Sequence, residues 1–450
     1  MKIKHIFIGL GLLCFFQIAN AQSILEKYIR KGLENNESIK QRSFAFQRSL
    51  LALDEAKTLF LPNISFQTNY TLAAGGRTID FPVGDILNPV YGTLNQLTAS
   101  NNFPQLKNQS ILLNPNDFYD AKFRTTFPVI NQEIKYNLRI KEKQVSIQQM
   151  EINIYKRELV KDIKTAYFKY IQSTEAIKIY ETALDLVNEN SRVNNVLLRN
   201  EKINRTVVLR SDNEVQKFQA LIAVAKKNKE SAIAYFNFLL NQPLEESITI
   251  DSVFTKPSNN LLSNNSIDDR EEIKLLRTSA EINKELTGLA KSALRPKVNS
   301  FVDFGGQGFD FKVNKNTPYV FFGFAMQWDI FSGGKNKLKI KQADIGSKII
   351  ASQTDYVTSQ LNVQLNNNIN AFNASVSLYE FSLIQENTSL QVYSDMLKIY
   401  KEGQALFIEL LDAQNQLINA RLQSNIALYE AWIKATDIER SSASFNLNLN

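Results

Sequence analysis

The stretch AKTLFLPNISFQTNY, residues 56–70, joins two kinds of local pattern. Its first residues continue a helical pattern, whereas the residues after Pro62 alternate between apolar and polar side chains, as a strand does. A second stretch, AKSALRPKVNSFVDFG at residues 290–305, makes the same change at Pro296. Proline cannot continue a helix, and it biases the preceding residue toward extended geometry. Pro62 and Pro296 are therefore predicted to be helix-to-strand hinges.

The two stretches belong to a tandem repeat. Aligning the two prolines gives an offset of 296 − 62 = 234, at which Glu37 matches Glu271. Farther along, TFPVINQEIKYNLRIKEKQ resembles DIFSGGKNKLKIKQAD at an offset of 331 − 127 = 204. The first repeat thus carries about thirty additional residues, which fall in the Gly-, Pro- and Asn-rich span 75–115. This span is predicted to be a long surface loop.

Each repeat reads as helix, strand, loop, strand, long helix and return helix. The strands are predicted at about 63–73, 118–130, 297–309 and 318–331. In YVFFGFAMQWDIF one face is apolar throughout and includes Phe322, Phe324 and Trp328, whereas the opposite face holds Tyr319, Gly323, Gln327 and Asp329. Such segregation suits a water-filled transmembrane β-barrel with these aromatic residues toward lipid, although a sheet packed on a soluble core is the alternative. Four strands cannot close a barrel, so a barrel would require several chains.

The helices show coiled-coil spacing. From Val129 to Gln242 the chain contains neither Gly nor Pro, and no proline follows Pro318. The last long helix has apolar residues at alternating steps of four and three, which is the heptad pattern. This predicted seam comprises Leu365, Ile369, Phe372, Val376, Tyr379, Leu383, Glu386, Leu390, Tyr393, Leu397 and Tyr400. The predicted seam of the return helix is rich in small residues: Leu406, Leu410, Ala413, Leu417, Ala420, Ser424, Ala427 and Ala431.

The N-terminal sequence predicts export. MKIKHIFIGLGLLCFFQIANAQ has early lysines, an apolar core and an Ala-Asn-Ala site, which predict a signal peptide cleaved after Ala21. Cleavage removes His5 and Cys14, the sole histidine and cysteine, and lowers the formal charge from +7 to +5. Histidine- or cysteine-based catalysis, zinc sites with such ligands and disulfides are then excluded. We expect no enzyme activity, no cofactor and no nucleic-acid partner.

Several motifs together resemble one family. The doubled hinge, the WDIFSGGK turn and the segment YKEGQALFIELLDAQNQLINARLQSNIALYEAW are similar to the outer-membrane factor family of TolC-like efflux and secretion channels. The resemblance covers nearly the whole chain after the signal peptide. The first repeat departs from the pattern, because it lacks the Gly-Gly of the turn and has no glycine where the second repeat has Gly403.

The resemblance implies a mainly α-helical protomer with a membrane β-barrel portion. Three chains would share a 12-stranded barrel in the outer membrane, and their helices would form a tunnel in the periplasm. The implied function is a passive export duct of a tripartite efflux or type I secretion system. Its implied partners are a periplasmic adaptor (membrane fusion) protein, an RND-type or ABC-type inner-membrane pump, and outer-membrane lipid.

The resemblance also implies gate residues at the periplasmic tip. Asp412 matches the family's Leu-Leu-Asp-Ala position, and Glu409 lies one turn earlier on the same helix face. Three-fold symmetry would make rings of these carboxylates, although both could be ordinary solvated side chains. Gly403 is expected to turn the chain between helices, and Tyr400 either bonds between helices in the closed state or packs in the core.

The repeat divides the chain into five predicted parts: a signal peptide (1–21), a first repeat (22–242), a linker (243–268), a second repeat (269–443) and a C-terminal tail (444–450). A periplasmic coiled-coil structural or adhesive protein is the alternative interpretation. It explains the helical seams but not the four one-sided strands. A carboxylate-based hydrolase would require two carboxylates in a cleft, and the pattern predicts none.

Overall fold

The computed structural model describes four stretches of the chain: residues 24–114, 116–250, 254–258 and 266–447. The predicted signal peptide and its cleavage site lie outside the described residues. The chain divides into two compact units, each of which contains parts of both sequence repeats. The smaller unit comprises Ser49–Val145 and Ala280–Ile349, and the larger one comprises the residues up to Arg48, Ser146–Ser279 and the residues from Ile350 onward.

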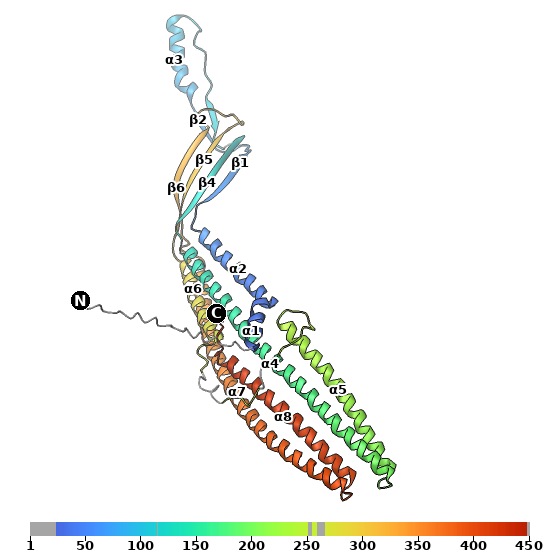
Figure 1. The fold of residues 1–450 in the computed structure, drawn as a ribbon. Helices are drawn as coiled ribbons and strands as arrows, with labels where there is room; N and C mark the ends of the chain where they lie inside the picture. Colours follow the sequence, from blue (N-terminus) through green and yellow to red (C-terminus); the bar gives the residue numbers. More distant parts are fainter. Residues whose placement is uncertain (1–23, 115, 251–253, 259–265, 448–450) are drawn as a thin grey trace, which may run out of the picture. The chain divides into compact units, whose positions relative to one another are not determined.

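The smaller unit holds a four-stranded antiparallel sheet in the order β1-β4-β5-β6 (Figure 1). Its strands are β1 (Asn63–Thr71), β4 (Phe118–Ile130), β5 (Lys297–Phe309) and β6 (Pro318–Gln327). Each repeat supplies two of the strands, and β4 of the first repeat pairs with β5 of the second along almost its whole length. The two repeats are thus joined in one sheet whose outer strands are β1 and β6.

The two hinges have the same local structure. Helices α2 (Glu37–Thr58) and α6 (Glu271–Ser292) each have 22 residues, and each ends in a short turn before its proline. The N–H of Leu61 donates to the Thr58 carbonyl at 2.9 Å, and the N–H of Arg295 donates to the Ser292 carbonyl at 3.0 Å. Pro62 and Pro296 follow these turns and directly precede β1 and β5.

The span after β1 is not the long surface loop that its composition predicts. It forms β2 (Thr78–Phe81), α3 (Val83–Thr98) and β3 (Gln109–Leu112), with β2 and β3 paired antiparallel. The prediction was wrong because the asparagines that favour loops here bond to the backbone of a neighbouring segment. Asn88 and Asn95 of α3 fix the extended residues that follow the helix.

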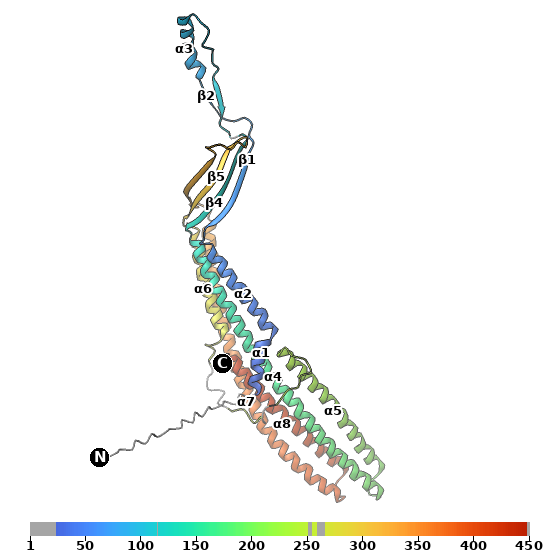
Figure 2. The ribbon, with the colours of Figure 1, turned by 45° about the horizontal axis from the view of Figure 1, so that its top comes forward.

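The larger unit is helical. It contains α1 (Ile24–Asn35), α5 (Arg205–Leu239), α8 (Phe407–Ser441) and most of the long helices α4 (Gln132–Arg199) and α7 (Lys335–Lys401). Helices α4 and α5 run side by side, as do α7 and α8, in both views (Figures 1 and 2). Helices α5 and α8 each have 35 residues and start at an offset of 407 − 205 = 202. Within the described residues, every helix is too short or too polar to span a lipid bilayer.

The seam of the return helix is largely as predicted. From Leu410 to Ala431, every predicted seam position of α8 is buried, and only Leu406 at the start is exposed. The seam of α7 is correct at Leu365, Phe372 and Tyr400 but wrong at Leu383 and Leu390, which are exposed. Ser382 and Ser389, one residue earlier, are buried instead. Small serines allow the close approach of the neighbouring helix, so the leucines face outward.

Candidate functional site

The tip of the larger unit consists of the two turns that join α4 to α5 and α7 to α8. Gly403 lies in the second turn with φ of +78°, and its N–H donates to the Tyr400 carbonyl at 2.9 Å. The N–H of Gln404 donates to the Ile399 carbonyl at 3.1 Å, which completes a Schellman helix end. Gly403 therefore ends α7 in a left-handed conformation, as expected for a residue that turns the chain.

The first repeat makes the same turn without glycine. Glu201 has φ of 54°, and the N–H of Lys202 donates to the Leu197 carbonyl at 2.9 Å. Asn204 then caps α5 by accepting the N–H of Thr206 at 3.0 Å. Glu201 precedes Gly403 by 403 − 201 = 202, which is the offset of the return helices. At this offset, 412 − 202 = 210, the exposed Arg210 occupies the place of Asp412.

A buried polar cluster joins the two helical hairpins near the tip. The Tyr400 hydroxyl donates to Asn194 Oδ1 of α4 at 2.5 Å, and burial raises the pKa of this tyrosine. Asn190 Nδ2 donates to Gln414 Oε1 of α8 at 2.6 Å. Tyr400 is thus both a core residue and a hydrogen-bond donor between helices. Nothing in the sequence pattern distinguishes Asn190, Asn194 and Gln414 from exposed amides, so the prediction missed them.

The two predicted carboxylates of the tip have different roles in the structure. Asp412 is exposed on α8 and accepts a hydrogen bond from Gln416 Nε2 at 2.7 Å. Glu409 accepts the N–H of Leu406 through its Oε2 at 2.8 Å, so it caps the first turn of its own helix. Both line a hollow of about 370 Å³ that Val392 and Met396 of α7 also border. Asp412 is therefore the carboxylate that is less engaged by the protein.

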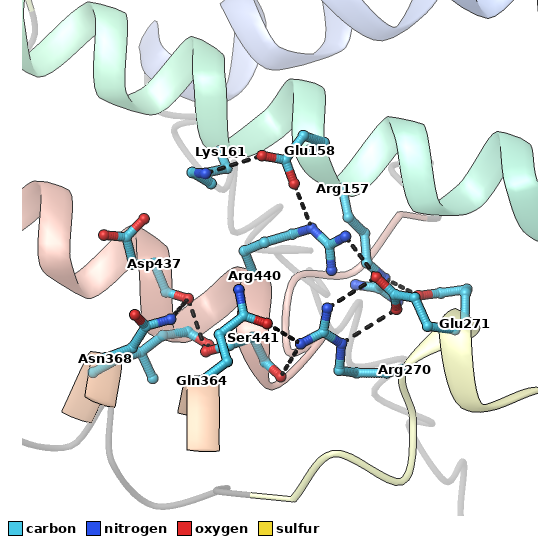
Figure 3. Close-up of polar contacts among 12 residues, drawn as sticks. Arg157, Glu158, Lys161, Arg270, Glu271, Gln364, Asn368, Asp437, Arg440 and Ser441 are labelled. Carbon is cyan, nitrogen blue, oxygen red and sulfur yellow. Dashed lines mark hydrogen bonds and ion pairs between the residues drawn. The ribbon is translucent and has the colours of Figure 1, made fainter. Parts of the chain in front are cut away.

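The opposite end of α8 is fixed by an arginine network, which we define as Arg157, Glu158, Arg270, Glu271, Glu272 and Arg440. Figure 3 labels all of these residues except Glu272. Arg440 of α8 donates to Glu272 of α6 at 2.7 Å and to Glu158 of α4 at 2.9 Å. Arg270 donates to Glu272 at 2.9 Å and to Gln364 of α7 at 3.0 Å. The network therefore links α4, α6, α7 and α8.

The network also binds the chain that follows α8. Arg157 donates to Glu271 at 2.6 Å and to the carbonyl oxygens of Ala443 and Phe445 at 2.9 and 2.7 Å. Burial by itself would raise the pKa of Glu272, but hydrogen bonds and charges from Arg270 and Arg440 outweigh this effect and lower the pKa to about 2. Glu272 is thus charged at any physiological pH.

One face of the sheet in the smaller unit is charged and internally paired. Arg124 of β4 donates from Nε and Nη2 to the two carboxylate oxygens of Asp303 of β5, at 2.7 and 2.6 Å. Asp120 accepts both Lys122 Nζ and the Tyr319 hydroxyl of β6 at 2.5 Å. These bonds cross three adjacent strands, so the polar face is held together by charge-assisted hydrogen bonds.

The opposite face of the sheet presents exposed apolar side chains. Phe322 and Phe324 of β6 are exposed, and their rings meet edge to face at 5.2 Å. Trp328 is exposed too, but it lies one residue past the end of β6, which is shorter than predicted. Its indole N–H donates to the Leu294 carbonyl in the hinge after α6 at 3.0 Å. Among the described residues, no group of three or more acidic, histidine or cysteine side chains could hold a metal ion.

Comparison with known proteins finds outer-membrane channels that resemble this chain in sequence and in fold. No family model matches it. It aligns with the outer membrane protein TolC of Escherichia coli (strain K12) at 21% identity over 476 residues, covering 99% of this chain and 87% of that protein. The outer membrane protein TolC of Salmonella enteritidis aligns at 20% identity over 470 residues. The chain is similar to the TolC proteins over nearly its whole length, in agreement with the resemblance to the outer-membrane factor family.

Solved structures of outer-membrane channels share the fold of this chain. The outer-membrane channel OprN matches with a TM-score of 0.74 and 15% identity, covering 94% of this chain and 90% of that one. VceC of Vibrio cholerae matches with a TM-score of 0.74 and 13% identity, covering 93% and 95%. CmeC of Campylobacter jejuni matches with a TM-score of 0.73 and 13% identity, covering 100% and 95%. The family resemblance is confirmed, and the comparisons agree with the expectation that the chain is not an enzyme.

Proposed function

We propose that three copies of this chain form an export channel in the outer membrane, as a component of a tripartite efflux or type I secretion system. The sheet of the smaller unit carries this proposal. In the described residues its outer strands β1 and β6 each have one unpaired edge, and one face exposes large aromatic side chains. A sheet with two open edges and an apolar face is an aggregation hazard in water unless other chains and lipid cover it.

Three protomers would solve both problems. Since β1 and β6 are antiparallel within the sheet, β1 of one protomer can pair with β6 of the next. The resulting ring would have 3 × 4 = 12 strands, a number between those of the small closed barrels and the large porins. Phe322, Phe324 and Trp328 would then contact lipid, and the charged pairs around Arg124 and Asp120 would line the water-filled interior.

The hinges connect this barrel to the helices. Pro62 and Pro296 would mark where two helices of each protomer reach the membrane and become strands. The helical unit would stand in the periplasm, where the helices of three protomers line a tunnel. The predicted repeats 22–242 and 269–443 would each supply one pass of barrel and tunnel wall, joined by the linker 243–268.

The tip would be the gate. A three-fold ring of Asp412 would favour cations and repel anions, with Glu409 contributing less because it caps α8. Tyr400 and Gly403 would hold the closed turn through the bond to Asn194 and the left-handed helix end. Opening requires a partner that binds the open state better than the closed one. A periplasmic adaptor that is coupled to an RND-type or ABC-type inner-membrane pump would supply this difference.

Fractionation of cells that express the full chain tests the proposal. We expect the protein in the outer membrane, with unheated samples migrating in electrophoresis as a species of three chains and heated samples as one. A soluble monomeric or dimeric rod in the periplasm would contradict the channel and favour a coiled-coil structural or adhesive protein.

A further inference from the structure

The insertion of the first repeat forms an arm, which we define as residues 73–114, and hydrogen bonds hold its two sides together. Two asparagines of α3 each use both ends of the side-chain amide on one residue of the returning segment. Asn88 accepts the N–H of Leu106 at 2.7 Å and donates to its carbonyl at 2.9 Å. Asn95 accepts the N–H of Phe103 at 3.1 Å and donates to its carbonyl at 2.8 Å. These contacts imitate the pairing of two strands.

The spacing of these rungs matches helix and strand geometry. Asn95 lies seven positions after Asn88 in the helix, a rise of about 10.5 Å, and Leu106 lies three positions after Phe103 in the extended segment, a rise of about 10 Å. Asp85 and Asn108 add a third rung, with Asn108 accepting the Asp85 N–H at 3.1 Å and donating to its carboxylate at 2.9 Å. The returning segment is therefore fixed along one face of α3.

The opposite face of α3 is apolar and uncovered. It carries what we name the α3 stripe: Ile86, Val90, Thr93 and Leu97. The exposed fractions of Ile86, Val90 and Leu97 are 64%, 51% and 78%. The stripe steps by four, three and four residues, which is the heptad spacing by which one helix packs on another. A helix that presents such a seam to solvent is suited to a helical partner.

The charge of the stripe narrows the choice of partner. Between Val83 and Leu106 the only charged residue is Asp85, which is already bonded to Asn108. A helix that lies on a lipid surface has basic residues on its polar side, and α3 has none. A charged protein partner would find nothing to pair with. An uncharged heptad seam instead suits identical copies of itself, because symmetry brings like residues together without electrostatic repulsion.

We propose that the α3 stripe binds α3 of the other two copies, so that three helices cap the outer mouth of the channel. This inference rests on the proposed trimer. Strand β1 starts at the hinge and the arm leaves from its other end, so three-fold symmetry places three arms at the barrel end away from the helices. The three α3 helices would then form a second barrier at the exit, distinct from the periplasmic tip. Exported molecules would have to separate these helices in order to leave.

Single-cysteine cross-linking in outer membranes tests the cap. Cys14 is replaced by alanine in the full chain, and either Val90→Cys on the stripe or Gln96→Cys off the stripe is added. Both positions are exposed on the same helix, so Gln96→Cys is the matched control. After mild oxidation we expect disulfide-linked dimers for Val90→Cys and none for Gln96→Cys, because a disulfide requires Cα atoms about 4.4–6.8 Å apart.

Unheated electrophoresis of the same samples separates two kinds of failure. Absent or equal cross-linking of the two variants in an intact trimer overturns the cap and leaves the channel standing. Absence of the trimer overturns both.

Discussion

Replacing Glu272 by glutamine should destabilise the helical unit and remove a defined part of its pH dependence. The carboxylate accepts hydrogen bonds from Arg270 and Arg440, which come from the start of α6 and the end of α8. Glutamine keeps the size of the side chain but removes its negative charge. Two largely buried guanidinium groups then lose their shared counter-ion, which costs more than an exposed ion pair is worth.

The pKa of Glu272 sets the magnitude. It falls from 4.5 to about 2 in the folded protein, because the two arginines outweigh the effect of burial. A difference of about 2.5 pH units corresponds to about 3 kcal/mol, and the 21% exposure of the side chain lowers the expected loss to about 2–3 kcal/mol. Since the folded pKa is depressed, this stability is present above pH 4.5 and is lost as the pH falls toward about 2.

Thermal unfolding followed by far-ultraviolet circular dichroism measures the effect. Glu230→Gln is the control, because Glu230 forms an exposed pair with Lys227 within α5. At neutral pH, Glu272→Gln should melt several degrees below the wild type and Glu230→Gln should not. The gap between Glu272→Gln and wild type should shrink as the pH falls below 4.5. A gap that equals that of the control, or that does not change with pH, would refute the role of the network.

Three further predictions concern the tip. Leu410→Ala, at a side chain with 0% exposure, should lower the free energy of unfolding by about 3 kcal/mol, whereas Leu406→Ala at the exposed start of α8 should change it little; equal losses in denaturant titration would contradict the packing. Glu201→Gly should raise the same free energy by about 1 kcal/mol, because φ of 54° suits glycine, and Gly403→Ala should lower it by a similar amount. A fall for Glu201→Gly, or a rise for Gly403→Ala, would show that the two turns are not equivalent. Asp412→Asn should reduce the preference for cations in single-channel recordings, whereas Asp395→Asn on the exposed face of α7 should not; unchanged selectivity would exclude a ring of Asp412.

The hinges and strands could be predicted because their signals are local. A proline after a helical pattern, followed by alternation, is sufficient to place β1 and β5, and the predicted bounds of β4 and β5 are those observed. Strand β6 ends at Gln327 rather than near residue 331. The chain leaves the sheet there, and the Trp328 indole bonds to the hinge of the same repeat. The alternation of apolar residues continues past Gln327, where the pairing of β6 with β5 ends, so the alternation alone overestimates the length of the strand.

Features that depend on contacts between distant residues escaped prediction. Glu272 and Arg440 are separated by 168 positions, and neither belongs to a motif. The arm was predicted to be a loop because asparagine, glycine and proline favour turns, whereas here Asn88 and Asn95 bond to an adjacent segment. The α7 seam was misplaced at Leu383 and Leu390 because hydrophobicity alone cannot show that two serines allow closer helix packing. In the first repeat, where no prediction was made, Glu201 makes the turn that Gly403 makes in the second.

Cross-linking of the sheet edges tests the central claim most directly. The chain would carry Ala325→Cys in β6 and, in turn, cysteine at each position of β1, in a background without Cys14. If three protomers share one barrel, oxidation in the outer membrane should link separate chains at some β1 positions, with alternation along the strand. Products of two and three chains, and none larger, are predicted. Absence of any link between chains, or a ladder of ever larger products, would contradict a closed three-chain barrel.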